Sequence, residues 1–436
     1  MNCFHVLARA GLASLVLASC SPAPPAQTAA TDLNPATGGK QAHSVDLTQG
    51  LGFFTARFYK ALATKAGPNE NLFVSPLSLS QGLGLAWLGA RGQTADEMRS
   101  LLGWHNAANP AVLTARYNAF LLATGDPQVE IRIANALWLA KTLPVRPEYL
   151  SAAKAAYDAA PASVDFANAP VAAADRINGW VSNHTRGRIP VIVSADNFDG
   201  ATAAVLTNAV YLKADWQAAF EKSAQATFIT GNGTRKPIDL MERVAAMQYR
   251  ETAEGQAVAL PYGQSGRYVM EVFLPREAAT LGRWERKLHG LSFFDGEEGS
   301  DGRFDLSTAK RQTILLRLPR FEARFNGSVN QALIEAGMPC AFKAECASFA
   351  GIAPLPMKID DVAHATFLRV DEEGTEAAAA TAIRMVATGI MIVPDNIPRM
   401  IVDRPFLLTI RDRASGALIF FGRIADPTAA KPRGTL

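Results

Sequence analysis

Apolar residues follow two different spacings along the chain, and each spacing predicts a different kind of element. Helical spacing near the start of the folded region predicts an amphipathic helix that buries Leu51, Phe54, Phe58 and Leu62. Leu72 to Val74 is a short apolar run that predicts a strand. Proline suits the first turn of a helix, so Ser75-Pro76 marks the start of a second helix, which is apolar on nearly all sides and therefore buried.

The start of that second helix carries two hydroxyl groups whose role has two interpretations. Ser75 can act as an ordinary N-cap of the helix. Alternatively, Ser75 and Ser78 are buried hydroxyls that need hydrogen-bond partners from elsewhere in the fold. Spacing alone leaves both interpretations open.

Strands dominate the later part of the chain. Runs rich in β-branched and aromatic residues predict strands at Val129–Ala140, Val205–Leu212, Ala257–Tyr262, Tyr268–Pro275, Leu315–Phe321, Phe406–Ile410 and Ala417–Ile424. Shorter helices are predicted to start with a cap at Thr94 and to cover Ile177–Asn183 and Val329–Ala336. No second linker separates these elements, which favours a single large α+β domain over residues 46–427.

The stretch from Thr375 to Met385 fits two kinds of secondary structure. Alternate residues form one uncharged face and one face that carries Glu376 and Arg384, as a half-buried strand requires. However, Thr375-Glu376 followed by four alanines also resembles a capped helix start. The pattern leaves open a short surface helix and a segment that adopts two states.

The first residues have the layout of a secretory signal. Arg9 precedes an apolar run, Ala10 to Leu17, that is too short to span a bilayer and ends in Ala18-Ser19-Cys20. Leu17 to Cys20 resembles a bacterial lipobox, which implies a signal peptide at 1–19 and a lipid on Cys20; a plain signal peptide is the alternative. Because Ser21 follows, we expect a lipid-anchored, extracytoplasmic protein at the outer membrane, in the periplasm or on the cell surface.

The composition predicts a tether before the folded domain and gives no support for a nucleic-acid partner. Residues 20–45 are mainly Pro, Ala, Thr and Gly and predict a flexible tether, and 428–436 form a C-terminal tail. A formal net charge of +3 over 436 residues gives no reason to expect nucleic acid as a partner. Outside the cytoplasm, Cys340 and Cys346 can form a disulfide or stay reduced.

No motif of an enzyme is present in the sequence. The six histidines do not occur in a zinc-protease motif, and there is no nucleophile elbow, phosphate-binding loop or paired-cysteine metal motif. We therefore expect no catalytic residues, no metal site and no cofactor.

Several segments resemble motifs of the serpin family and follow one another in the order of that family. They are Asn71–Ser78, Ile177–Val181 with Thr185–Ile189, Leu206–Trp216, Leu318–Phe321, Asp403–Phe406 and Phe420–Ile424. The segment that reads Glu-Glu-Gly-Thr-Glu-Ala-Ala-Ala-Ala-Thr is similar to the hinge of the reactive-centre loop in inhibitory serpins; its residues are Glu372, Glu373, Gly374, Thr375, Glu376, Ala377, Ala378, Ala379, Ala380 and Thr381. The resemblance covers almost all of 46–427.

This resemblance implies a fold and a set of site residues. The fold would be one large domain with a central, mostly antiparallel sheet, two further sheets, about eight or nine helices and an exposed reactive-centre loop at about 372–400. Ser75, Ser78, Asn208 and His364 would form the shutter, a buried hydrogen-bond cluster beneath the main sheet. Trp216 would mark the breach, where the loop begins to enter that sheet.

The resemblance also implies a function. The chain would be a monomeric inhibitor of serine proteases that is cleaved in its loop, forms an acyl-enzyme and inserts the hinge side of the loop into the sheet. The family count places the cleaved bond at Thr388–Gly389, which suits elastase- or subtilisin-like proteases, although the loop is long enough for a bond anywhere between Arg384 and Ile392. A non-inhibitory serpin with a binding or storage role is the alternative.

Overall fold

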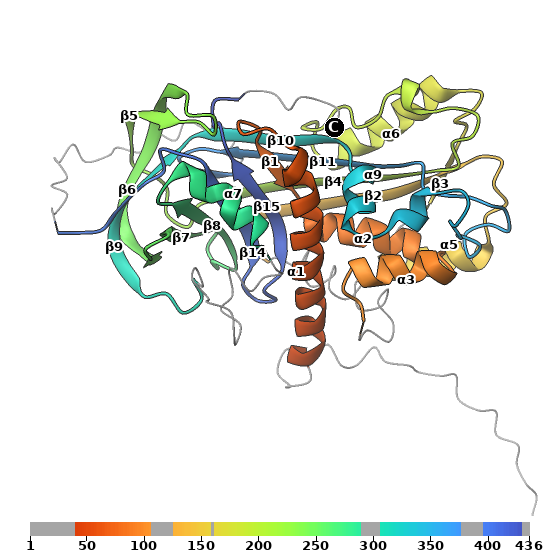
Figure 1. Ribbon diagram of the computed structural model, residues 1–436, viewed down its shortest axis with the longest axis horizontal. Coiled ribbons are helices and arrows are strands. Elements are labelled where there is room, and N and C mark those ends of the chain that lie inside the picture. Colours follow the sequence, from red (N-terminus) through yellow and green to blue (C-terminus); the bar gives the residue numbers. More distant parts are fainter. Residues whose placement is uncertain (1–39, 106–124, 158–160, 289–305, 376–395, 430–436) are drawn as a thin grey trace, which may run out of the picture. The chain divides into compact units, whose positions relative to one another are not determined.

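Two β-sheets and the helices packed on them form the part of the chain that the structure describes. The computed structural model describes residues 40–105, 125–157, 161–288, 306–375 and 396–429 (Figure 1). Residues from Gln41 onward belong to one compact unit, as expected for a single large domain.

Helices occur from the start of the described chain to just before β11 (Asp361–Val370). The seven described α-helices are α1 (Lys40–Lys65), α2 (Pro76–Trp87), α3 (Gly92–Leu101), α5 (Pro147–Tyr157), α6 (Pro170–His184), α7 (Leu281–Arg286) and α9 (Asn330–Ala336). The described residues also form three 3-10 turns: η1 (Ala195–Asn197), η2 (Ala278–Thr280) and η3 (Pro339–Phe342). α9 ends where Gly337 adopts a φ of 125°, which glycine tolerates more readily than other residues.

The smaller sheet has six strands in the order β10-β11-β12-β4-β2-β3. Its strands are β2 (Val129–Ala140), β3 (Ala162–Val164), β4 (Ala204–Asp215), β10 (Phe321–Ser328), β11 (Asp361–Val370) and β12 (Gly374–Thr375). Most neighbours are antiparallel, whereas β4 runs parallel to β11 and β2 runs parallel to β3.

The larger sheet has nine strands. They are β1 (Leu72–Val74), β5 (Lys222–Ile229), β6 (Arg235–Glu251), β7 (Gly255–Pro261), β8 (Tyr268–Pro275), β9 (Arg311–Pro319), β13 (Arg399–Ile401), β14 (Phe406–Asp412) and β15 (Leu418–Ile424). We expected two separate sheets beside the central one, but the described residues form one. The reason is β6, whose 17 residues pair with β5, β9 and β7 in turn and so join the strands into a single sheet.

The six-stranded sheet is covered on both faces. Figure 1 shows α6 on one side of its strands and α2 on the other. Alternation along β4 explains this arrangement, because Leu206 and Val210 join the main core with α2, whereas Val205 and Ala209 pack with Ile177 of α6. Polar residues on the two faces therefore lie in different surroundings.

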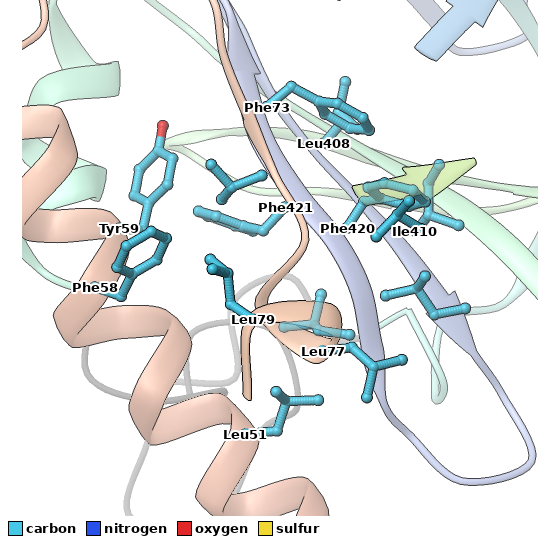
Figure 2. Close-up of a cluster of buried hydrophobic side chains, with 14 of the residues drawn as sticks. Leu51, Phe58, Tyr59, Phe73, Leu77, Leu79, Leu408, Ile410, Phe420 and Phe421 are labelled. Atoms are coloured by element: carbon cyan, nitrogen blue, oxygen red, sulfur yellow. The ribbon is translucent and has the colours of Figure 1, made fainter. Parts of the chain in front are cut away.

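Aromatic and aliphatic side chains join α1, α2 and the larger sheet (Figure 2). The rings of Tyr59 on α1 and Phe421 on β15 meet edge to face, with centroids 4.5 Å apart. Phe73 on β1 stacks on Phe420, and Leu77 of α2 contributes to the same buried cluster. These contacts fix α1 against β15 and beside the start of α2.

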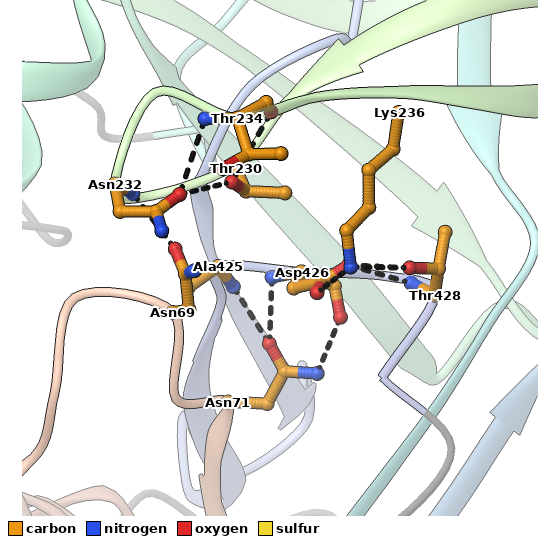
Figure 3. A network of polar contacts seen from close by, with 9 residues as sticks. All are labelled: Asn69, Asn71, Thr230, Asn232, Thr234, Lys236, Ala425, Asp426 and Thr428. Carbon is orange, nitrogen blue, oxygen red and sulfur yellow. Dashed lines mark hydrogen bonds and ion pairs between the residues drawn. The ribbon is translucent and has the colours of Figure 1, made fainter.

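Asn71 joins the start of β1 to the end of β15 (Figure 3). Its Oδ1 accepts hydrogen bonds from the backbone N–H groups of Ala425 and Asp426 at 2.8 and 2.9 Å. Its amide group donates to the carbonyl oxygen of Asp426 at 2.8 Å, and Lys236 forms an ion pair with the Asp426 carboxylate. One side chain thus satisfies three backbone groups where the two strands end.

Several element boundaries differ from those predicted. The tether was expected to continue to residue 45, but α1 begins at Lys40, because no glycine or proline interrupts the chain between Gly39 and Gly50. α6 begins at Pro170, well before Ile177, because proline is favoured in a first helical turn and alanines follow it. The strand predicted at Leu315–Phe321 is two strands, β9 and β10, which belong to different sheets.

Candidate functional site

The parallel pairing of β4 with β11, here called the seam, opens at one end. Its last pair is Tyr211 level with Phe367. Beyond that pair the short strand β12 lies between the two strands, with Thr375 level with both Ala214 and Val370. β12 is antiparallel to both neighbours. A strand that continued β12 along the seam would replace one parallel ladder by two antiparallel ladders, which are slightly more stable per residue.

Gly374 and Thr375 fit this position for different reasons. A Cβ on Gly374 would lie 2.2 Å from the carbonyl oxygen of Ala214, so a larger residue would push β12 away from β4. Thr375 is fully buried, and its hydroxyl lies 2.6 Å from that of Tyr262. Burial raises the pKa of Tyr262, so its phenol stays protonated and can donate this hydrogen bond. A charge at position 375 would be buried without a partner.

Trp216 holds the backbone that leads into β12. Its indole N–H donates to the carbonyl oxygen of Asp371 at 2.9 Å, and its backbone N–H donates to that of Glu373 at 2.7 Å. The backbone N–H of Phe220 donates to the carbonyl oxygen of Glu372 at 2.9 Å. Three successive carbonyl groups just before β12 are therefore fixed, two of them by Trp216, the residue predicted to mark the breach.

Two further side chains at this end of the seam had no predicted role. The ring of Tyr262 stacks on Trp216, with centroids 4.4 Å apart. Arg320 forms an ion pair with Glu372, in which Nε lies 2.7 Å from Oε1. Arg320 belongs to the motif Leu318–Phe321, but no local pattern in the sequence indicates its partner. The pair is about half exposed on the arginine side, so its contribution to stability is about 0–1 kcal/mol.

Ser75, Ser78, Asn208 and His364, the four residues expected at the shutter, meet beneath the seam. His364 on β11 is level with Asn208 on β4, and Nδ1 lies 2.5 Å from Oδ1. The backbone N–H of Ser75 donates to Nε2 of His364 at 3.1 Å. The Asn208 amide donates to the Ser78 hydroxyl at 2.6 Å. Any strand that entered the seam here would separate His364 from Asn208.

These hydrogen bonds determine the protonation state of His364. Since Nε2 accepts a hydrogen bond from Ser75, the ring proton lies on Nδ1 and is donated to Asn208. Burial lowers the pKa of His364 to about 3, because the charged imidazolium would lose its hydration. The ring is therefore neutral at ordinary pH.

Asn135 completes the same cluster, although no role was predicted for it. It lies on β2 level with Asn208, and its Oδ1 accepts hydrogen bonds from Asn208 and from the Ser78 hydroxyl. Its amide reaches Gln81 of α2 at 3.4 Å. The only signal in the sequence was a polar residue in the middle of an apolar strand. Its partners follow from strand register, which spacing along the chain does not provide.

Cys340 and Cys346 form a disulfide with their Cα atoms 5.3 Å apart, a pairing that the sequence left open. The bridge lies beside α3, where the hydroxyl of Thr94 is 3.5 Å from the Cys340 sulfur. We predicted Thr94 as the helix cap, which is wrong. α3 begins at Gly92, and the Thr94 hydroxyl instead accepts a hydrogen bond from the backbone of Ser348 at 3.0 Å. The hydroxyl is used to fix the disulfide loop.

Other predicted residues lie outside the described part of the chain. They are the hinge residues after Thr375, namely Glu376, Ala377, Ala378, Ala379, Ala380 and Thr381, together with Thr388, Gly389 and Cys20. Within the described ranges, no group of three or more His, Cys, Asp or Glu side chains is arranged to bind a metal ion. None of the described helices is long and apolar enough to cross a membrane.

Relatives of known family resemble this chain over most of its length. A serpin-like protein of Thermococcus kodakarensis is 34% identical over 395 residues, which cover 89% of this chain and 87% of the relative. The human leukocyte elastase inhibitor is 30% identical over 368 residues, which cover 83% of this chain and 94% of that protein. The native structure of the thermophilic serpin tengpin matches with a TM-score of 0.76 and 25% identity, over 87% of this chain and 94% of tengpin.

A match to a family model identifies the family itself. Residues 49–427 match the family model described as Serpin (serine protease inhibitor). The fold agrees, since uncleaved ovalbumin also matches with a TM-score of 0.76 at 24% identity over 88% of this chain and all of that one. Proteins of this family are generally protease inhibitors and not enzymes. The chain belongs to the serpin family.

Proposed function

We propose that this protein inhibits serine endopeptidases as a suicide substrate. One observation carries the proposal: β12 already lies between β4 and β11, antiparallel to both, at the open end of a parallel seam. Only the first two residues of the insertion strand occupy this position, so the remainder can follow after cleavage. The two antiparallel ladders formed in this way would supply the driving force for insertion of the loop.

The chemistry belongs to the protease, and this chain supplies the peptide bond. The protease serine oxygen attacks the carbonyl carbon of the cleaved bond, and an ester forms as the new amino terminus leaves with the proton. The segment on the hinge side then enters the seam, still joined to the protease through that ester. Inhibition results when insertion is faster than hydrolysis of the ester.

The register of β12 restricts where the cleaved bond lies. Continued along the seam, this register brings Thr381 level with Asn208 and His364, where its hydroxyl can replace the hydrogen bond that insertion separates. The same register brings Arg384 level with Val205 and Asp361, the first pair of the seam. A bond after Arg384 is needed to fill the seam, a condition that the nominal bond Thr388–Gly389 meets together with the other bonds up to Ile392.

We propose elastase- or subtilisin-like proteases as targets. A threonine before the cleaved bond suits proteases that accept small side chains, and one relative is named as an inhibitor of leukocyte elastase. The test is to mix the purified protein with elastase-, subtilisin-, chymotrypsin- and trypsin-like enzymes and to look for an SDS-resistant complex. Sequencing the released C-terminal fragment identifies the bond.

A hinge variant separates inhibition from a binding or storage role. Thr375→Arg places an unpaired charge in a fully buried position, so the variant should be cleaved as a substrate without forming a complex. If the unmodified protein is cleaved with neither a complex nor a rise in thermal stability, the non-inhibitory alternative holds.

We also propose that the protein is a monomer anchored outside the cytoplasm through a lipid on Cys20. The support is the sequence Leu17-Ala18-Ser19-Cys20 alone. Metabolic labelling with a radioactive fatty acid should label the full-length chain and not Cys20→Ala. If the two chains carry the same amount of label, Cys20 is not the lipidated residue and the alternative of a plain signal peptide remains. Sedimentation of the soluble domain tests whether the protein is a monomer.

A further inference from the structure

Two cations face each other across the mouth of the seam. Continued two residues beyond its last pair, Tyr211 with Phe367, the register of the seam brings Lys213 on β4 level with Arg369 on β11, one position from the level of Thr375. Both alternate with core residues and therefore point to the α6 side of the sheet. A strand inserted between β4 and β11 would have one of its own residues opposite both cations, and opposite charges across neighbouring strands are favourable.

Neither cation has a strong ion pair in the described structure. Lys213 forms no salt bridge with any described residue. Arg369 is 55% exposed, and the carboxylate of Asp371 lies at 4.0 Å. Glu322 is level with Arg369 on β10 but is paired with Arg324. Glu130 is level with Lys213 on β2 but is shared between Arg132 and Arg186. An anion on a strand between them could pair with both Lys213 and Arg369.

The chain itself supplies an anion at the right position. Thr375 is level with Ala214 and with Val370, so the next residue of an inserted strand would be level with Lys213 and Arg369. That residue is Glu376. It also falls on the α6 side, because Thr375 points to the opposite face, where its hydroxyl meets Tyr262.

The far end of the seam carries the opposite charge. Asp361 begins β11 on the α6 side, and it forms no salt bridge with the described residues. Burial, with a smaller contribution from Asp360, raises the pKa of its carboxyl group, although a hydrogen bond from Ser328 opposes this. The register that brings Glu376 to the mouth brings Arg384 level with Asp361.

Small residues separate these two charges. On the α6 side of the inserted strand, only alanines lie between Glu376 and Arg384, at positions 378, 380 and 382. Of the residue pairs that would flank the inserted strand on this side, Tyr211 with Phe367 has the largest side chains, and both are almost fully buried. An alanine of the inserted strand would lie between them. The receiving face is therefore cationic at the mouth, crowded at the next pair inward and acidic at the far end.

We propose that Lys213 and Arg369 form an anion-receiving site, and Asp361 a cation-receiving site, for the segment Glu376–Arg384 of the same chain. The inference rests on the proposed insertion of this segment and adds what sets its register. A slip of one residue would bury Glu376 in the core face, and a slip of two would place it between Tyr211 and Phe367. Charge matching at both ends selects the one register that fills the seam.

The test is a charge-reversal experiment with a reciprocal rescue. Lys213→Glu with Arg369→Glu leaves Glu376 between two like charges, so insertion should slow by about fivefold. The measured result is a fivefold lower ratio of SDS-resistant complex to cleaved, uncomplexed protein. Adding Glu376→Lys restores opposite charges and should return the ratio to within about twofold of the original protein. Lys60→Glu with Lys310→Glu is the matched control, because these exposed lysines lie outside the six-stranded sheet.

A second arm tests the far end without a protease complex. After loop cleavage, Asp361→Asn and Arg384→Gln should each lower the thermal midpoint of the cleaved form, and the double variant should lower it no further than either single one. If the double variant lowers the thermal midpoint by the sum of the two single effects, Arg384 does not pair with Asp361.

The outcomes separate this inference from the function on which it rests. If the unmodified protein gives neither a complex nor a cleaved form of raised stability, both the proposed function and this inference are refuted. If it gives both, but the Lys213 and Arg369 variant behaves like the lysine control, or Glu376→Lys gives no rescue, the receiving site is refuted and the inhibitory function stands.

Discussion

His364 links the closed seam to pH through a single side chain. It accepts a hydrogen bond from Ser75 and donates one to Asn208, and both contacts need the neutral ring. Its pKa is about 3 in the folded chain, against an ordinary value of 6.5. In the pH range between these values the unfolded chain binds a proton that the folded chain does not bind.

The first prediction concerns the free energy of unfolding as a function of pH. His364 contributes fully to the free energy of unfolding above pH 6.5. Below that pH its contribution falls by about 1.4 kcal/mol for each pH unit, until the pH reaches the pKa of His364 in the folded chain. Urea unfolding of the domain at pH 8, 6 and 5 measures the slope. His364→Gln should unfold with a shallower dependence on pH, and an unchanged slope in that variant would contradict the assignment.

The second prediction concerns the hydrogen bond between Tyr262 and Thr375. Tyr262→Phe keeps the ring that stacks on Trp216 but leaves the buried Thr375 hydroxyl without this partner, at a cost of about 1–3 kcal/mol. Hydrogen exchange of the Thr375 amide should accelerate by about tenfold or more. Thr375→Val in the same background should recover most of the loss, since both polar groups are then removed; full additivity of the two changes would argue against a direct bond.

At the scale of elements, apolar patterning predicted strands better than it predicted their ends. β2 has the predicted bounds, Val129–Ala140, because apolar residues recur at alternate positions along it and Asn135 is the one polar residue of that series. The early start of α6 at Pro170 was not predicted because its first turns are mostly alanine, which gives no apolar stripe. The contacts of Asn135 and Tyr262 depend on strand order, so no local pattern could predict them.

The third prediction tests the disulfide that holds the segment between α9 and β11. Cys340 and Cys346 are six residues apart, and closing so short a loop stabilises the folded chain by about 2 kcal/mol in the chain-entropy account. Dithiothreitol should lower the urea midpoint of the oxidised protein accordingly. The double variant Cys340→Ser with Cys346→Ser should show that lower midpoint with or without reductant, and a response of the variant to reductant would point to another cause.

At the scale of the whole molecule, the described strands limit how much of the loop can enter the sheet. The seam extends from β12 to the level of Val205 and Asp361, which the continued register reaches at Arg384. Residues from Met385 onward have no place in the seam. The length of the loop after that point should therefore affect access to the protease, and not the stability of the inserted form.

This division of the loop gives the last prediction. Cleavage of the unmodified loop should raise the thermal midpoint by about 10 °C, because two antiparallel ladders replace one parallel ladder. Deleting Ala379 and Ala380 keeps the alternation of faces but brings Arg384 two positions short of Asp361 and moves Thr381 away from Asn208, so most of that rise should be lost. Deleting Val393 and Pro394 removes the same number of residues outside the seam and should preserve the rise. Differential scanning calorimetry of the cleaved proteins measures both, and an equal loss in the two deletions would mean that total loop length, and not register, controls insertion.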